Sequence, residues 1–482
     1  MKTTISKHDW LTAIDCGAKA WFQLREEPSP PTEADRFRME QGTHIGVLAQ
    51  SLFPDGILVN PSGELSVTAI TQKLISDQNT NTFFEAAFKF DQLATKADIL
   101  NRESDGWHVL EVKSSFSDSK SINEYILDLA YTTMVVELCG LTVATSSLVL
   151  LNRDYLYGDD PTKLFEIVDK TSEVKEIIAG FVVMREELVS ALFRDDQPAH
   201  SLSSSCRSCA YFDEDCLGMG IEYTVLDIPS LHHTKLKKLS ASIIVDLRYF
   251  PDEIAISDVQ ERAKICMLNN EIYTGLGLQE ELDGITWPCY YLDFETVATV
   301  LPLYADHGCH QQILTQFSLH SRISADGKLQ HCEYLANASK DCQRELTEKL
   351  IDALGNEGAI FVYSSFEKTR INAMAELYPD LAEALSSIIE RLVDLLIILK
   401  EHVYHPKFKG SYSIKKVLPA LVPDLSYDGL DIGDGDMAIT MFAKMALGEV
   451  VDTDQVRNDL LAYCKLDTLA MVRLHDALLG YR

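Results

Sequence analysis

Long apolar segments are missing from this sequence. Apolar runs such as Leu395-Leu396-Ile397-Ile398-Leu399 are far shorter than the ~20 residues that a membrane-spanning helix needs. The first ten residues contain no apolar core of the kind that secretory signals have. We therefore expect a cytoplasmic protein without a membrane partner. With 482 residues, of which 46% are apolar and 24% charged, the chain is also too apolar for general disorder and long enough for two or three domains.

An excess of positive charge is also lacking. Lys and Arg number 43 against 73 Asp and Glu, which gives a net charge of -30. Proteins that bind nucleic acid through their overall charge are usually basic. If this chain binds nucleic acid, it must do so through a local basic segment or through bound metal ions. Residues 400–416 form such a segment, with five lysines against Glu401 alone, although a solvated loop explains them equally well.

The cysteines do not fit a disulfide framework. The chain has 11 of them, an odd number, and no secretory signal, so we expect thiols. Seven lie in apolar patterns and are expected to be small buried side chains: Cys139, Cys266, Cys289, Cys309, Cys332, Cys342 and Cys464. Cys206, Cys209 and Cys216 instead lie in a polar, loop-like stretch, and Cys16 is their candidate partner. On chemistry alone, four such thiolates favour tetrahedral Zn²⁺ over an iron–sulfur cluster.

Local patterns divide the chain into three regions. Residues 1–222 mix helical and strand-like patterns, residues 223–280 have the pattern of short helices, and residues 281–482 mix strands and long helices. This organisation predicts an α/β protein with two α/β domains joined by a helical connector.

Several individual elements are expected from these patterns. Strand-like runs lie near 83–115 and 146–151, and a strand rich in aromatic residues lies at 289–295. Long helical patterns span 381–400 and 454–479.

Acidic and basic residues come together in the first region. Asp98 lies in one strand-like run, and Glu111-Val112-Lys113 lies in the next, after a short turn. Glu111 and Lys113 are two apart on a strand and share a face, and Asp98 joins them if it ends the neighbouring strand. Two carboxylates can hold a divalent cation while the lysine orients water or stabilises charge on a phosphate. The alternative is a surface strand with an ordinary Glu–Lys pair.

A second acidic set lies in the last region. Asp293 and Glu295 share one face of a strand, which is the arrangement needed to bridge two cations. Tyr463 and Asp467 are four apart in a helical pattern and share a helix face. Tyr463 can orient an attacking water there while Asp467 completes the metal shell. Each of these pairs is common when taken alone.

The first acidic set resembles the catalytic motif of RecB-like PD-(D/E)XK nucleases, in which Asp98, Glu111 and Lys113 would be catalytic. Gly42-Thr43-His44-Ile45-Gly46 resembles the helical histidine motif of that group, and this resemblance makes His44 a further metal ligand. On the following helix the family usually has Gln where this chain has Thr132, which leaves the role of that helix open.

The cysteine pattern resembles the iron–sulfur subgroup of the same nucleases, which includes CRISPR-associated and AddB-type members. One cysteine, Cys16, precedes the motif, and Cys206, Cys209 and Cys216 follow it. The resemblance implies a restriction-endonuclease-like domain over 1–222 whose two ends are stapled by a [4Fe–4S] cluster, and it favours the cluster over Zn²⁺.

The second acidic set resembles the DEDDy branch of DnaQ-like 3′–5′ exonucleases, which have an RNase H-like fold. For residues 281–482 the resemblance implies that Asp293, Glu295 and Asp467 are metal ligands and that Tyr463 is catalytic.

The remaining carboxylate of that set has two candidates. Glu367 follows a short strand-like run in the place where the family has Asp, and we favour it over Asp394. The basic, hydroxyl-rich residues 408–416 would then lie near the nucleic-acid path. His405 and Tyr412 can contact phosphate or base there, or simply pack locally.

Together the resemblances predict a nuclease that uses Mg²⁺ or Mn²⁺ at two sites to hydrolyse DNA, either single-stranded or at duplex ends. Thr132 and Glu367 depart from the family patterns and motivate an alternative, an iron–sulfur scaffold that binds nucleic acid with one or both sites inactive. A ribonuclease is the other alternative. RecB-like nucleases often work beside a helicase, and because this sequence lacks the Gly-x-x-x-x-Gly-Lys-[Ser/Thr] motor motif, a helicase would be a separate partner.

Overall fold

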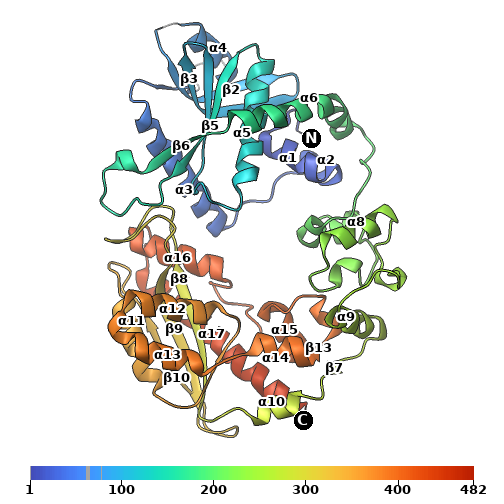
Figure 1. The fold of residues 1–482 in the computed structure, drawn as a ribbon, viewed down its shortest axis with the longest axis vertical. Coiled ribbons are helices and arrows are strands. Elements are labelled where there is room, and N and C mark those ends of the chain that lie inside the picture. The colour runs from blue at the N-terminus through green and yellow to red at the C-terminus, as the bar shows by residue number, and fades with distance from the viewer. Residues whose placement is uncertain (1, 61–65, 78, 482) are drawn as a thin grey trace. The chain divides into compact units, whose positions relative to one another are not determined.

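The computed structural model describes residues 2–60, 66–77 and 79–481. The chain forms two compact units (Figure 1), which are Met1–Ser201 with Thr299–Gln311, and Leu202–Ala298 with Gln312–Arg482. Each unit combines helices and strands, so the expected α/β class is confirmed. Over the described residues, no helix combines the length and the apolar character that crossing a membrane requires.

The first unit is built on a six-stranded sheet in the order β1-β2-β3-β4-β5-β6. β2, β3 and β4 form an antiparallel meander, β5 runs parallel to β4, and β6 pairs antiparallel with β5. The strands are β1 (Ile57–Leu58), β2 (Thr82–Phe90), β3 (Leu93–Glu103), β4 (Gly106–Val112), β5 (Val143–Leu151) and β6 (Phe165–Asp169). The expected strand-like runs near 83–115 and 146–151 are therefore confirmed as β2 to β4 and β5.

Helices cover both faces of this sheet (Figure 1). α5 makes the crossover from β4 to β5 and packs on one face together with α1, α2 and α6. α3 packs on the other face through the buried Ile45 and Ala49. The helices are α1 (Lys7–Asp15), α2 (Gly17–Arg25), α3 (Glu33–Ala49), η1 (Gln50–Leu52), α4 (Val67–Ser76), α5 (Ile122–Leu138), η2 (Pro161–Lys163) and α6 (Thr171–Phe193).

The second unit contains a five-stranded sheet in the order β10-β9-β8-β11-β12. β8, β11 and β12 run parallel, whereas β9 is antiparallel to both of its neighbours, β8 and β10. The strands are β8 (Cys289–Val297), β9 (Ile313–Arg322), β10 (Gln330–Leu335), β11 (Ala359–Val362) and β12 (Leu392–Asp394). The strand expected at 289–295 is thus confirmed as the central strand, β8.

Two sets of helices enclose this sheet. One apolar core joins one face to α11 (Gln343–Leu354), α12 (Phe366–Leu377) and α13 (Ala382–Glu390). Another core joins the opposite face to α14 (Leu395–His402), α15 (Ile414–Leu421) and α17 (Thr453–Gly480), while α16 (Gly435–Leu447) packs on β8 and α17. The short helices η6 (Pro379–Leu381) and η7 (Pro406–Phe408) lie in the connecting segments.

The prediction of one long helix over 381–400 is wrong, whereas the helix predicted over 454–479 is confirmed as α17. The 381–400 segment forms α13, then the edge strand β12, and then α14. Leu392-Val393-Asp394 pairs with β11 in parallel register, Val362 lying opposite Asp394. The helical period of the flanking residues hid this strand, because a run of three residues is too short to show a period of its own.

The segment expected to be a helical connector, 223–280, lies within the second unit. Its apolar residues share one core with α14 and α17. The cysteine segment and the connector contain η3 (Ser204–Ser208), α7 (Phe212–Asp215), η4 (Val225–Asp227), α8 (His233–Ala241), η5 (Leu247–Tyr249), α9 (Asp258–Asn269), β7 (Tyr273–Thr274) and α10 (Leu278–Asp283). β7 pairs with β13 (Val403–Tyr404), which ties the connector to the segment that follows α14.

Candidate functional site

Two acidic side chains of β8 lie against α17 in the second unit. Asp293 and Glu295 are two residues apart and project from the same face of the strand. Cys464 of α17 lies opposite them, and its thiol donates to Asp293 Oδ2 at 3.4 Å. The ligand atoms of these three residues all lie within 4.8 Å of one another. This spacing matches a group of ligands around one metal ion.

A third carboxylate, Asp467, comes from α17 and is held by two phenols. Tyr427 donates to Asp467 Oδ1 at 2.6 Å, and Tyr463, one helical turn before Asp467, also hydrogen-bonds to it. Burial raises the pKa of Asp467 to about 6 despite these two bonds. Burial, followed by the charge of Asp467, raises the pKa of both Tyr427 and Tyr463. Both phenols therefore stay protonated and act as hydrogen-bond donors.

Glu367 and Asp394 follow two neighbouring parallel strands at the same edge of the sheet. Glu367 lies in the first turn of α12, just after β11, and is 4% exposed. Its Oε2 has no hydrogen-bond partner among the residues that the structure describes. Asp394 ends β12 and caps α14, accepting the Leu396 N–H at 2.9 Å. Burial, with a further effect from the charges of Asp394 and Asp467, raises the pKa of Glu367 to about 7.

These carboxylates repel one another. Burial and the charges of Asp467, Glu295 and Glu367 raise the pKa of Asp293 well above its usual range. Burial and the charges of Asp467 and Glu367 do the same to Glu295. The charge of Glu367 thus reaches both β8 acids, whereas Asp394 acts on Glu367. A divalent cation would offset this repulsion, and because carboxylate oxygens are the ligands that Mg²⁺ and Mn²⁺ prefer, the donor set fits these ions.

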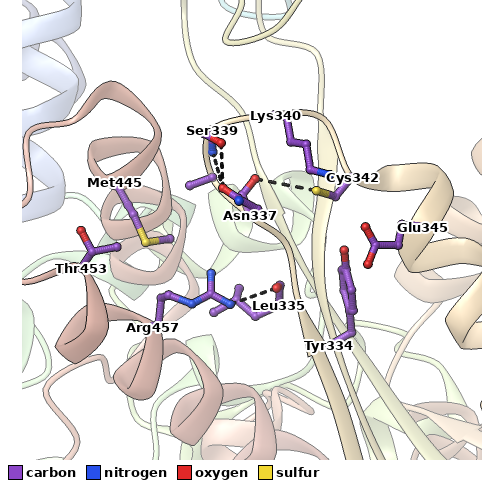
Figure 2. Close-up of a pocket in the computed structure, with 11 residues that line it drawn as sticks. Tyr334, Leu335, Asn337, Ser339, Lys340, Cys342, Glu345, Met445, Thr453 and Arg457 are labelled. Atoms are coloured by element: carbon purple, nitrogen blue, oxygen red, sulfur yellow. Dashed lines mark hydrogen bonds between the residues drawn. The ribbon is translucent and has the colours of Figure 1, made fainter.

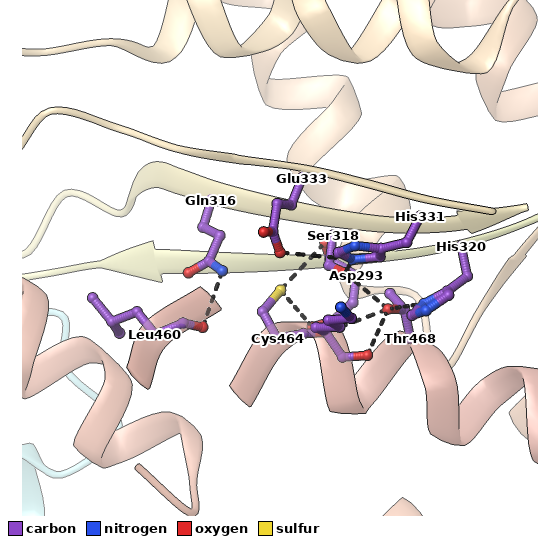
Figure 3. Close-up of polar contacts among 10 residues, drawn as sticks. Asp293, Gln316, Ser318, His320, His331, Glu333, Leu460, Cys464 and Thr468 are labelled. Atoms are coloured by element: carbon purple, nitrogen blue, oxygen red, sulfur yellow. Dashed lines mark hydrogen bonds and ion pairs between the residues drawn. The ribbon is translucent and has the colours of Figure 1, made fainter. Parts of the chain in front are cut away.

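A buried polar network fixes α17 against β9 and β10 beside the acids (Figure 3). The hydroxyl of Thr468, which follows Asp467, lies 2.7 Å from His320 Nδ1 and 2.8 Å from the Ser318 hydroxyl. Ser318 in turn lies 2.9 Å from His331 Nε2. Burial lowers the pKa of His320 to about 4, so this ring is neutral at pH 7. The network sets the position of α17 along the sheet, and thereby that of Asp467.

A cavity of about 590 Å³ in the same unit is lined by none of these acids (Figure 2). It lies between β10, the loop before α11, and the helices α16 and α17. Arg457 points toward the backbone there and donates to the carbonyls of Leu335 at 3.1 Å and Ala336 at 2.9 Å. Its charge is thus engaged by the chain itself, and the lining contains one carboxylate, Glu345. This cavity does not have the ligands of a divalent-cation site.

In the first unit, the structure brings Asp98, Glu111 and Lys113 together. Asp98 Oδ2 accepts the Val112 N–H at 2.8 Å, and Lys113 Nζ lies 3.1 Å from Glu111 Oε1. Glu111 is 2% exposed, and its Oε2 lacks a hydrogen-bond partner within the described ranges. Burial and the charge of Glu111 raise the pKa of Asp98 to about 7. Two carboxylates and an ammonium therefore lie together beside α5, with Glu111 buried and Asp98 and Lys113 half-buried.

Two side chains that the sequence reasoning did not assign to this site contact it. Lys7 of α1 forms an ion pair with Glu111, and Asp128 of α5 forms one with Lys113. Burial opposes the Glu111 charge, but Lys7 and then Lys113 hold the pKa of Glu111 below its usual value. Burial also opposes the Lys113 charge, yet the two acids raise the pKa of Lys113. Thr132, one turn after Asp128, is fully buried and hydrogen-bonds to Thr95 instead, so Asp128 and not Thr132 contacts the site from α5.

His44, which the family resemblance makes a metal ligand, lies on the exposed side of α3. Across the described residues, the structure does not place it in a group of three ligands within 4.8 Å together with Asp98 and Glu111. A metal-binding role for His44 stays a prediction.

The four predicted cluster cysteines lie in different units. Cys16 lies between α1 and α2, whereas Cys206, Cys209 and Cys216 lie around η3 and α7 of the second unit. The Ser203 N–H donates to the Cys206 sulfur at 3.5 Å. The [4Fe–4S] cluster, and Zn²⁺ as its alternative, both stay predictions.

Two other candidates from the sequence occupy the segment after α14. Tyr412 is 7% exposed and packs on Phe408 and Tyr404 with ring centroids 5.7 and 6.0 Å away. His405 Nδ1 accepts the Lys407 N–H at 3.1 Å and caps η7. The structure therefore supports local packing for these two aromatic residues.

A second group of possible metal ligands, which the sequence reasoning missed, lies on α10 and α14. Glu281 Oε2 is 2.7 Å from His402 Nε2, and Glu401 completes the group. Both glutamates are exposed, unlike the acids beside α17.

The chain is similar to one protein domain and to one curated protein, both without a described activity. Residues 290–413 match a domain of unknown function (DUF2779), and this range runs from β8 to the start of α15, including Asp293, Glu295, Glu367 and Asp394. The chain is 29% identical over 205 residues to the uncharacterized protein UU173 of Ureaplasma parvum serovar 3, a match that covers 38% of this chain and 30% of that protein. The chain thus spans less than a third of the relative it matches, and neither name states an activity.

Proposed function

We propose that the second unit is a metal-dependent 3′–5′ exonuclease with an RNase H-like fold. The observation that carries this proposal is the group of mutually repelling, buried or half-buried carboxylates from β8, α12 and α17. The sheet order β10-β9-β8-β11-β12, with Asp293 and Glu295 on the central strand and Glu367 just after the neighbouring parallel strand, is consistent with that fold. Glu367 is the preferred fourth carboxylate because its charge reaches both β8 acids, whereas Asp394 caps α14.

In this proposal Asp293, Glu295, Glu367 and Asp467 hold the cation. Bound there, Mg²⁺ or Mn²⁺ supplies an activated water and stabilises the charge that develops on the phosphate oxygens. The protein positions the remaining parts. Tyr427 fixes Asp467 by a short hydrogen bond, and the protonated phenol of Tyr463 would orient the attacking water.

We further propose that the first unit is a RecB-like nuclease with a restriction-endonuclease-like fold and an iron–sulfur staple. The meander β2-β3-β4 followed by α5 and the parallel strand β5 supports this fold. Asp98 and Glu111 would hold a divalent cation, and the ammonium of Lys113 would stabilise the phosphate. DNA is the proposed substrate of both units.

The experiment uses the full chain, purified anaerobically, with end-labelled single-stranded DNA and Mn²⁺. Lys113→Ala and Asp293→Ala should each remove one product ladder, and the double variant should remove all products. Lys89→Ala and Asp326→Ala change exposed residues of the same types and serve as matched controls. Labels at the 5′ and at the 3′ end separate the polarities of the two sites.

Three results would change this proposal. If both single variants cleave as the wild-type protein does, the site assignments are wrong. Degradation of an RNA strand with the DNA left intact would make the protein a ribonuclease. Binding without hydrolysis under any divalent metal would favour the iron–sulfur scaffold.

A further inference from the structure

A groove of about 950 Å³ runs between the connector and the segments next to the acids of the second unit. One wall is formed by Tyr363 and Ser364 at the end of β11, by Lys400 of α14, and by residues 410–414. The opposite wall comes from the connector, with Ser230 and the start of α9, and from Arg207 of the cysteine segment. The DnaQ-like resemblance does not account for the second wall, because it lies outside residues 281–482.

The groove is lined by residues that directly precede the segment of one carboxylate. Ser364 lies three residues before Glu367 and has a positive φ of 146°, a strained conformation for a residue with a side chain. The charge of Lys400 acts on Asp394, and the charge of Lys415 acts on Asp467. In the proposal, a chain of phosphates lying along the groove leads toward these acids.

Positive charge is concentrated at the start of α15, next to the groove residues 410–414. The first turn of α15 contains Lys415 and Lys416 and no acidic residue, although a helix N-terminus is already positive. Both lysines are exposed, and Ser411 and Ser413 supply hydroxyl groups beside them. This concentration of positive charge is unfavourable in isolation, and a bound phosphate would neutralise it.

We propose that this groove binds a single-stranded nucleic acid, with phosphates along Lys400 and the first turn of α15 and with the connector as the opposite wall. The inference rests on the proposed function and adds to it a role for the connector. A volume of this size encloses a drug-sized ligand, so it accommodates a few unpaired nucleotides. The exposed side chain of Val259 on the connector offers apolar surface to the bases.

The test measures binding separately from cleavage. Fluorescence anisotropy with labelled dT12 in Ca²⁺ gives the dissociation constant of the full chain over a range of salt concentrations. For Lys400→Ala/Lys415→Ala we expect weaker binding and a salt dependence shallower by about 1.4 in log Kd per log salt, the value for two lost phosphate contacts. Lys328→Ala, an exposed lysine in the turn between β9 and β10, should leave both values unchanged.

The role of the connector needs its own measurement. A strand with 5-iododeoxyuridine at successive positions, irradiated in the complex, should crosslink to peptides containing 229–230 or 257–260 as well as to 410–414. Crosslinks that omit the connector would overturn its role. Equal loss of affinity for a blunt duplex and for dT12 in the double variant would overturn single-strand binding, as would an unchanged salt dependence.

Failure of this inference is distinguishable from failure of the proposed function. If the chain binds dT12 through these lysines but hydrolyses nothing in Mn²⁺, the groove proposal stands and the exonuclease proposal fails. If the chain cleaves DNA and the lysine variants bind dT12 as tightly as the wild-type protein does, the exonuclease proposal stands and the groove proposal fails. A parallel series with rU12 shows whether the groove prefers DNA or RNA.

Discussion

Replacing Glu367 by Gln should stabilise the metal-free protein above neutral pH. The side chain is 4% exposed, and burial raises its pKa from 4.5 to about 7. Because the folded state binds this proton more tightly than the unfolded state, the contribution of Glu367 to stability is fully present below pH 4.5 and is lost as the pH rises through 7. The difference between the two pKa values corresponds to at most about 3 kcal/mol at pH 8. Glu367→Gln removes this penalty, which for a unit of this size corresponds to an increase in Tm of about 6 °C.

Differential scanning calorimetry at pH 5 and pH 8, in EDTA, measures this effect. For the wild-type protein, the Tm of the second unit should be higher at pH 5 than at pH 8. For Glu367→Gln, the same Tm should depend less on pH. Glu376→Gln, an exposed residue on the same helix, is the matched control. Added Mn²⁺ should stabilise the wild-type protein more than the Gln variant. Equal Tm values for Glu367→Gln and wild type at pH 8 would refute the claim that Glu367 is a buried, repelled carboxylate.

Three further outcomes are expected. Lys7→Met should tighten Mn²⁺ binding in the first unit by about tenfold, because the ammonium contacts the Glu111 oxygen that a cation would use; Lys120→Met is the exposed control, and an equal gain in both would contradict the reasoning. Mn²⁺ binding there, followed by electron paramagnetic resonance with the second site disabled, should tighten as the pH rises from 6 to 8, because the pKa of Asp98 is about 7; a flat pH profile would count against this site. Thr468→Val should destabilise the protein by about 1–3 kcal/mol in urea unfolding, because it leaves buried partners unsatisfied, whereas Thr468→Ser should retain most of the stability.

The elements of this fold that the sequence predicts are those with a strong local pattern. α17 extends over seven turns with a steady helical period, and β8 is rich in aromatic residues, so both were identified within two residues of their ends. The pairs Asp293 with Glu295 and Tyr463 with Asp467 lie within single elements, and local spacing alone places each pair on one face.

What could not be predicted depends on contacts between distant residues. Lys7 reaches Glu111 across 104 positions of sequence, and Tyr427 reaches Asp467 across 40. No local pattern marks either residue, because each is defined by the packing of its own element against another one. β12 was missed for a related reason, since its three residues form a strand only by pairing with the edge of β11.

The net charge of -30 does not argue against nucleic acid once its distribution is considered. In both candidate sites the lysines stand beside buried acids: Lys7 and Lys113 contact Glu111, and the charges of Lys400 and Lys415 act on acids of the second unit. Binding of divalent cations would cancel the charge of those acids and leave the lysines as the dominant local charge. An overall acidic protein would thereby present positive charge to phosphate at its two sites when metal is bound. On this reasoning, affinity for a nucleic-acid strand should increase on addition of Ca²⁺ to the metal-free protein, and a strand that binds equally well in EDTA would contradict it.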